Sequence, residues 1–175
     1  MESLTEPRRA ARETVRQQVT ALYQAHALGL VRLAVLMVGD QPTAEDVVQD
    51  AFLALYRRWP TLKDPDRALG YARASVLNGC RMVHRANSRH DGISLAAPDD
   101  TESAEETALL GEASREVLAA LRRLPARQRE AVLLRYYLDM TEDQAARAMR
   151  VSRGTVKSAT SRGLSALGRL LKEEQ

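Results

Sequence analysis

The chain has 175 residues, of which 45% are hydrophobic and only 4% aromatic, and its formal net charge is +3. Glycine and proline are few and strand-like runs of Val, Ile and Thr are missing, so we expect an all-α protein with aliphatic helix packing rather than a β-rich one. The single cysteine, Cys80, excludes an internal disulfide framework and fits a reducing compartment.

The N-terminal residues contain no apolar core, so they do not form a signal peptide. The most apolar run, 27–38, is interrupted by Arg32 and is too short to cross a bilayer. We therefore expect a cytoplasmic protein without membrane insertion.

Three helices are predicted in a first domain over 8–90. The first, over 8–38, is long and amphipathic. Thr43 then caps a helix over 44–59. Asp64 followed by Pro65, an N-cap before a proline at the first helical position, opens a third helix that ends near Arg89.

The second of these helices has an acidic face with an apolar residue at its edge. Spacings of i, i+3, i+4 and i+7 place on it Asp46, Gln49, Asp50 and Leu53. In an otherwise basic domain such a face favours protein docking over DNA binding. An ordinary solvated helix face is the alternative.

The third helix combines an apolar stripe with a polar, basic face. The stripe consists of Leu69, Ala72, Val76, Cys80 and Val83. On the opposite side we expect Asn78, Arg81, Arg85 and Arg89. Arginines hold phosphates and an asparagine can read a base edge, although a solvated basic face would look the same.

An acidic stretch over 91–112 separates the two halves of the chain. It holds seven Asp or Glu residues and no Lys or Arg, so without it the formal charge of the remainder rises from +3 to +10. Clustered Asp, Ser and Thr with no helical period predict a flexible linker. A basic protein with an acidic middle suggests nucleic-acid contact on both sides of that linker.

A second helical domain is predicted over 113–173, and its main feature is a helix-turn-helix over 141–162. Thr141 and Gln144 have the spacing of a capping box, a tight turn follows at Arg150, and Ser152 caps the next helix. That helix is expected to bury Val156, Thr160, Leu164, Leu167 and Leu171.

The outer face of this last helix is basic and rich in hydroxyl groups. No acidic residue occurs from Ser152 to Lys172, which suits phosphates better than surface ion pairs. We therefore expect it to read the major groove of DNA. The predicted contacts are Arg153, Thr155, Lys157, Ser158, Ser161 and Arg162.

These segments resemble a known family. The runs AEDVVQDAFLALYRRW, YARASVLNGCRMVHR and LPARQREAVLLRYYLDMTEDQAARAMRVSRGTVKSATSRGLSAL are similar to bacterial RNA polymerase sigma factors of the sigma-70 family, in its small extracytoplasmic-function class. The resemblance covers roughly residues 15–172. One departure is Arg150, which stands where the family usually has glycine.

The resemblance implies a role for each face. The acidic face would dock on the clamp helices of core RNA polymerase, the polymerase flap being a further contact. Asn78 and its basic neighbours would recognise the melted −10 element, with the loop 59–66 supplying part of a base pocket. The last helix would recognise the −35 element, and the linker would thread the polymerase cleft. An anti-sigma factor is an expected partner, and no cofactor is expected.

Two other classes of protein compete with this interpretation. The chain could be a free-standing helix-turn-helix repressor or activator, with 8–90 as a sensing or dimerising domain. It could also be an enzyme or metalloprotein, since Cys80 and His84 are spaced i, i+4. Cys80 belongs to the apolar stripe and no further ligand is suggested, so we expect neither a metal nor catalysis.

Overall fold

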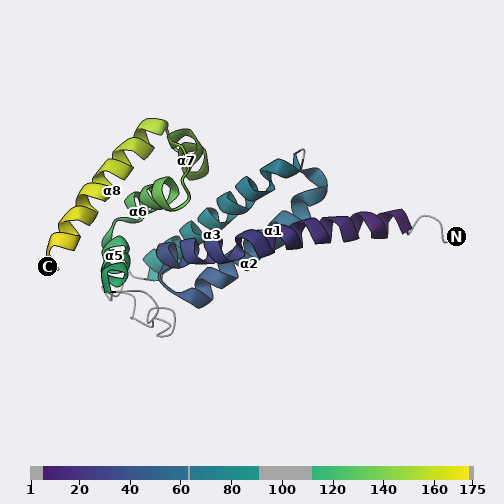
Figure 1. Ribbon diagram of the computed structural model, residues 1–175, viewed down its shortest axis with the longest axis horizontal. Helices are drawn as coiled ribbons and strands as arrows, with labels where there is room; N and C mark the ends of the chain where they lie inside the picture. Colours follow the sequence, from purple (N-terminus) through teal and green to yellow (C-terminus); the bar gives the residue numbers. More distant parts are fainter. Residues whose placement is uncertain (1–5, 63, 91–111, 174–175) are drawn as a thin grey trace.

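A computed structural model describes residues 6–62, 64–90 and 112–173. Those residues contain no strand, and their helices form two groups, as the all-α prediction requires (Figure 1). The first group contains α1 (Glu6–Val38), α2 (Gln41–Arg58) and α3 (Ala68–His90). The second contains α5 (Glu112–Arg123), α6 (Ala126–Val132), α7 (Glu142–Met149) and α8 (Arg153–Glu173). The predicted linker lies outside the described residues, except for Glu112 at the start of α5.

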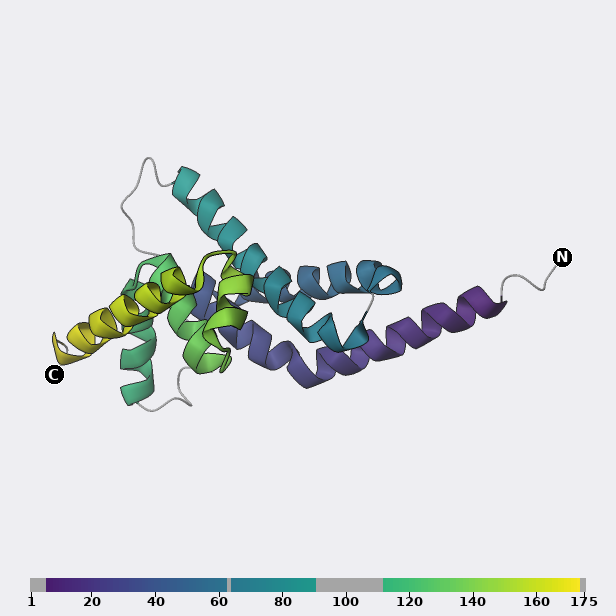
Figure 2. The same ribbon diagram turned by 90° about the horizontal axis from the view of Figure 1, so that it is seen from above.

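Helix α1 is the longest element, and its N-terminal part projects beyond the other helices (Figure 2). From Ala11 to Val38 it is long and apolar enough to cross a membrane by length and composition alone, with a mean hydropathy of 1.5. Its C-terminal half, however, buries Leu30, Leu33 and Met37 almost completely. Packing against the other helices therefore accounts for these three side chains, whereas Leu28 in the same half is 61% exposed.

Helix α2 begins earlier than the sequence pattern indicated. Asp40, in extended backbone conformation, is the N-cap, and its carboxylate accepts a hydrogen bond of 2.9 Å from the backbone N–H of Thr43. Pro42 occupies the first turn, where its missing N–H costs no intrahelical bond. The prediction that Thr43 caps this helix was wrong, because Thr43 lies inside the first turn that Asp40 closes.

The connection from α2 to α3 is made of two short 3-10 turns, Trp59–Thr61 and Pro65–Arg67. Asp64 caps the second turn, as predicted, and accepts a hydrogen bond of 3.0 Å from the N–H of Asp66. Helix α3 then packs very closely on α2 at Gly79. A Cβ atom at this position would lie 2.7 Å from Cγ1 of Val47, so only glycine fits without a shift.

In the second group, α6 and α8 are the central pair. A Cβ at Gly163 in α8 would lie 2.8 Å from Cγ2 of Val132 and 3.2 Å from the backbone oxygen of Gln128, both in α6. Helix α6 continues as a π-helical turn over Leu133–Tyr137. In this turn the N–H of Leu138 donates to the carbonyl of Leu133, five residues back.

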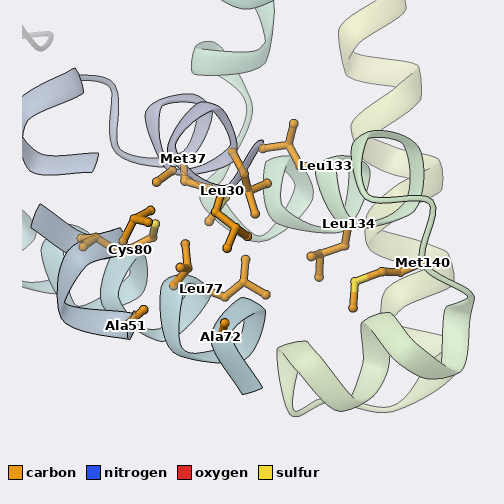
Figure 3. Close-up of a cluster of buried hydrophobic side chains, with 14 of the residues drawn as sticks. Leu30, Met37, Ala51, Ala72, Leu77, Cys80, Leu133, Leu134 and Met140 are labelled. Carbon is orange, nitrogen blue, oxygen red and sulfur yellow. The ribbon is translucent and has the colours of Figure 1, made fainter. Parts of the chain in front are cut away.

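The two groups of helices share one hydrophobic core. Leu30 and Met37 of α1 and Leu77 and Cys80 of α3 belong to the same cluster of buried side chains as Leu134 (Figure 3). Leu133 and Met140 of the second group also enter this cluster. The chain is therefore packed as a single body over its described residues, with an interface that the sequence pattern did not indicate.

Candidate nucleic-acid interface

The helix-turn-helix is built from local hydrogen bonds. The N–H of Gln144 donates to the hydroxyl of Thr141 over 3.2 Å, and the N–H of Thr141 donates to the side-chain oxygen of Gln144 over 2.8 Å, which completes the predicted capping box. The hydroxyl of Ser152 accepts from the N–H of Thr155 over 3.1 Å and so begins α8, as predicted.

The turn between these helices passes through Arg150, whose φ of 54° is left-handed. A non-glycine residue in this conformation costs about 1–2 kcal/mol. Its backbone N–H satisfies the end of α7 by pointing to the carbonyls of Ala146 and Arg147. The departure from the usual glycine thus changes the side chain at the turn and leaves the backbone geometry of the turn in place.

The six residues predicted to contact DNA from α8 divide into two sets. Lys157, Ser161 and Arg162 are exposed and make no hydrogen bond or ion pair that defines the turn among the described residues, whereas Arg153 is exposed but paired. The other three side chains already have partners within the helix-turn-helix. Arg153 Nε lies 2.7 Å from Oε2 of Glu142, the Thr155 hydroxyl lies 2.8 Å from that of Ser152, and the Ser158 hydroxyl donates to the carbonyl of Thr155 over 3.1 Å.

The Glu142–Arg153 pair also joins the first turn of α7 to the first turn of α8. Its hydrogen bond lowers the pKa of the Glu142 carboxyl and raises the pKa of Arg153. Glu142 therefore stays ionised and holds the guanidinium beside the turn. The sequence analysis did not include Glu142, although its place in the first turn of α7, opposite a basic helix start, was the available signal.

The buried side of α8 differs from the predicted stripe. Val156 and Gly163 are buried, and Thr160, Leu167 and Leu171 are half-buried. Leu164, which was predicted to be buried, is 38% exposed. The contact of Gly163 with α6 takes the place that the pattern had given to Leu164, because the glycine brings the two backbones together.

Helix α3 presents only part of its predicted polar face to solvent. Asn78 and Arg85 are exposed, and the side chain of Arg89 lies outside the described residues. Arg81 was expected on this open face, and that placement was wrong. Its guanidinium binds the carboxylate of Glu130 in α6 and donates to the carbonyl of Ala148 in α7 over 3.0 Å.

Cys80 and His84 occupy the inner side of α3. Burial raises the pKa of the Cys80 thiol to about 12, with the nearby Glu130 carboxylate as a second cause. His84 Nε2 lies 2.7 Å from the carbonyl oxygen of Met37 and therefore donates a proton to it. A buried thiol with a raised pKa is a poor thiolate ligand, so Cys80 does not complete the metal pair that its i, i+4 spacing from His84 suggested.

The acidic face of α2 is open to solvent. Asp46, Gln49 and Asp50 are exposed, and Leu53 is 47% exposed at their edge. Tyr56, three residues further along, is 38% exposed and extends the apolar edge by one turn. The sequence analysis missed Tyr56, although its i+3 spacing from Leu53 was visible.

Both groups of helices match described families. Residues 22–90 match Sigma-70 region 2, and residues 114–167 match Sigma-70, region 4. The chain is 33% identical to the RNA polymerase sigma-E factor of Streptomyces coelicolor over 143 residues, which are 79% of this chain and 77% of that protein. It is 32% identical to the ECF RNA polymerase sigma factor SigM of Mycobacterium tuberculosis over 150 residues, which are 86% of this chain and 75% of that protein.

A solved structure shares the fold. The chain superposes with a TM-score of 0.67 on the sigma factor RpoE of Bartonella quintana, determined in complex with the anti-sigma factor NepR. The match covers 89% of this chain and 99% of that one at 23% sequence identity.

The chain therefore belongs to the sigma-70 family of RNA polymerase sigma factors. Within that family its relatives place it in the extracytoplasmic-function (ECF) class. It is a sigma factor that directs transcription initiation, and the first and second groups of helices are its region 2 and region 4 domains.

Proposed function

We propose that the region 4 domain recognises the −35 element through the outer face of α8. The observation that carries this is the exposed set Lys157, Ser161 and Arg162 on the second helix of a helix-turn-helix. No acidic side chain occurs from Ser152 to Lys172, so no carboxylate on this helix competes with DNA phosphates for its basic residues. Arg153 stabilises the angle between the two helices through Glu142, and Thr155 and Ser158 support the start of α8.

The region 2 domain recognises the −10 element through α3. Asn78 and Arg85 are exposed and available for a base edge and a phosphate. Arg81 and Arg89 complete the basic face when α3 is bound to DNA. The loop 59–66, which begins with Trp59, supplies part of a pocket for an unstacked base. An aromatic ring is the usual platform on which such a base stacks.

The acidic face of α2 docks on the clamp helices of core RNA polymerase. Asp46, Gln49 and Asp50 supply the polar contacts, and Leu53 with Tyr56 supplies the apolar edge. An apolar patch rimmed by charge is the usual composition of such a contact. The polymerase flap is the second contact, on the region 4 domain.

The remaining assignments follow from this division of labour. The domains span 8–90 and 113–173, and 91–112 links them. The chain acts in the cytoplasm with core polymerase, and the chemistry of transcription belongs to the polymerase. The RpoE structure contains an anti-sigma factor, and a protein of that kind is the proposed regulator of this chain.

The deciding experiment is transcription in vitro with core polymerase of the native host and fragments of its genome as template. Adding the chain should create a set of new RNA 5′ ends that share sequences near −35 and −10. An Asp50→Ala variant should bind core polymerase more weakly while retaining the duplex-DNA affinity of the wild type. A chain that binds duplex DNA tightly and never supports initiation would instead be a helix-turn-helix repressor or activator.

A further inference from the structure

The N-terminal half of α1 carries a basic surface that the proposed roles of the other helices leave unused. Four arginines and one acidic residue occur over 8–24, and two of the arginines, Arg12 and Arg16, have described side chains that are exposed. The match to Sigma-70 region 2 begins at residue 22, so most of this segment lies outside the family match. Any function it has is therefore an addition to what the family match describes.

A hollow of about 450 Å³ opens on the side of this segment. Amide, hydroxyl and guanidinium groups and one small apolar side chain line it: Arg16, Gln17, Thr20, Ala21 and Gln24. All of these residues are exposed, and no carboxylate is among the described residues of the lining. Side chains of these types donate hydrogen bonds to phosphate oxygens and to base edges. The composition of the hollow therefore suits a nucleic-acid strand.

Glu13 is the acidic residue of this segment, and it is a weak competitor for such a ligand. Its Oε1 lies 2.8 Å from Nη2 of Arg16 and 3.4 Å from Nε2 of Gln17. The side chains of Arg16 and Glu13 are 69% and 47% exposed, and an ion pair as open to water as this one contributes little stability. A phosphate can therefore replace Glu13 as the partner of Arg16.

This segment lies beside the connection from α2 to α3. Helices α1 and α2 run in opposite directions, and the rings of Tyr23 and Phe52 meet edge to face with their centroids 5.0 Å apart. From this contact, α1 continues toward its N-terminus and α2 toward Trp59, so both reach the same end of the domain (Figure 2). Val15 and Trp59 pack against the same core. The segment is thus next to loop 59–66, where we place the base pocket.

The arginines lie between the buried side of α1 and the hollow. Val19 marks the buried side. At about 100° per residue, Arg12 and Arg16 follow it around the helix, and Gln24 on the far wall of the hollow comes after them. A strand that leaves loop 59–66 therefore meets the two guanidinium groups first and the hollow next.

The direction of α1 fixes which part of a promoter this surface can reach. Its N-terminal end points away from the region 4 helices (Figure 1). Region 4 is assigned to the −35 element, which is upstream. DNA followed from α8 past α3 therefore reaches the N-terminal half of α1 last, on the downstream side of the −10 element.

We infer that the α1 surface formed by Arg12, Arg16, Gln17, Thr20 and Gln24 binds the single DNA strand that leaves the −10 element on its downstream side. This role rests on the proposed recognition of the −10 element by α3 and loop 59–66, and it extends that contact. The arginines hold phosphates, and the amides and the hydroxyl contact phosphates or base edges. An acidic surface of the polymerase is the competing occupant, which would match the arginines but not the uncharged donors of the hollow.

The test uses the full chain bound to core polymerase of the native host. Two fork-shaped probes are made from a promoter found by transcription of the genomic template: in the short fork the single strand ends with the −10 element, and in the long fork it continues for about ten nucleotides, enough to cross the α1 surface. Affinity for each fork is measured by fluorescence anisotropy at several salt concentrations. The charge variant combines Arg12→Gln with Arg16→Gln, and its matched control combines Arg127→Gln with Arg169→Gln, two exposed arginines of region 4.

The wild type should bind the long fork about tenfold more tightly than the short fork at low salt, and the charge variant should lose most of this gain while binding the short fork as before. Its salt slope on the long fork should fall by about 1.4, because two single-strand phosphate contacts contribute about 0.7 each. Gln24→Ala should reduce the gain without changing the salt slope. The control should keep the ratio of the two affinities, and circular dichroism establishes that every variant is folded.

Equal binding of both forks by the wild type would overturn the proposal, and so would a full gain in the folded charge variant. Weaker binding of that variant to labelled core polymerase, with the gain intact, would assign the arginines to a protein contact instead. A wild-type holoenzyme that binds neither fork would contradict the proposed −10 recognition itself. Failure of the α1 contact and failure of the proposed function therefore give different results.

Discussion

Helices α3 and α8 both carry arginines and small polar side chains, but they present different shares of them to solvent. On α8, Lys157, Ser161 and Arg162 are exposed while the two domains are packed together. On α3, Asn78 and Arg85 are exposed, whereas Arg81 is held by Glu130. Two basic helix faces of similar composition can therefore differ in how many of their cations are available to DNA. Tertiary contacts, and not composition, decide which cations are available.

The largest expected effect tests the open face of α8. Arg162→Ala should weaken binding to a −35 duplex by about 1–3 kcal/mol if the guanidinium contacts a base, with a loss that depends on sequence. If it contacts only phosphate, the loss should be uniform across sequences and the salt dependence should decrease. Arg12→Ala, an exposed arginine of α1, is the matched control. Equal losses in both variants would show that bulk charge, and not this face, binds DNA.

A second prediction concerns the seating of α8 on α6. Gly163→Ala forces a Cβ to within 2.8 Å of Val132 and 3.2 Å of a backbone oxygen, so we expect a net loss of about 1–2 kcal/mol in the free energy of unfolding. Gly168→Ala in the same helix meets no atom within 4 Å and should stabilise by about 0.5–1 kcal/mol. Urea unfolding measures both. Stabilisation by both substitutions would contradict the close approach of α6 and α8.

A third prediction tests the inner side of α3 by pH. Burial and the neighbouring Arg129 lower the pKa of His84 in the folded chain, while the Met37 carbonyl and Glu130 act in the opposite direction. The unfolded chain binds the proton more readily, so the stability that neutral His84 contributes is fully present above about pH 6.5 and weakens as the pH falls below that value. The free energy of unfolding should therefore decrease between pH 7.5 and 5.5.

The control for this pH effect is His84→Gln, whose amide can still donate to the Met37 carbonyl but does not titrate in that range. Its free energy of unfolding should lack this part of the pH dependence. A variant that loses stability on acidification as the wild type does would assign the effect to another group.

The smallest expected effect concerns the surface pair between α7 and α8. Glu142→Gln removes the carboxylate that holds Arg153 and should weaken −35 binding slightly, an effect that added salt should diminish. Binding isotherms at two salt concentrations measure it. Tighter binding in Glu142→Gln would show that the pair restrains Arg153 from a direct DNA contact instead of positioning the helix.

The local features of the fold could be predicted from the sequence, and the contacts between domains could not. Thr141, Gln144 and Ser152 specify their caps within three residues, so their hydrogen bonds were predictable. Asp40 and Thr43 are both good capping residues in the same turn, and sequence alone did not choose between them. The prediction that Leu164 is buried used helical spacing alone. It could not include the close approach of α6 and α8 at Gly163.

Arg81 shows the limit more clearly. Its spacing from Asn78 and Arg85 placed it on the open polar face, which was wrong, because its partner Glu130 is 49 positions away in another domain. Glu130 follows Arg127 and Arg129 in a polar helix start, so nothing local indicated that it would be buried or which arginine it would bind. Pairings of this kind depend on how the domains dock, which no helical period encodes.

The buried thiol of Cys80 makes the closed core of region 2 directly measurable. Burial raises the pKa of this thiol to about 12, so it is protonated at pH 7, and its sulfur is inaccessible as well. A thiol-specific reagent can therefore react only when α3 moves away from its neighbours. The rate of that reaction is a clock for opening in the unmodified chain, and it can be read with polymerase or DNA present and with no label attached.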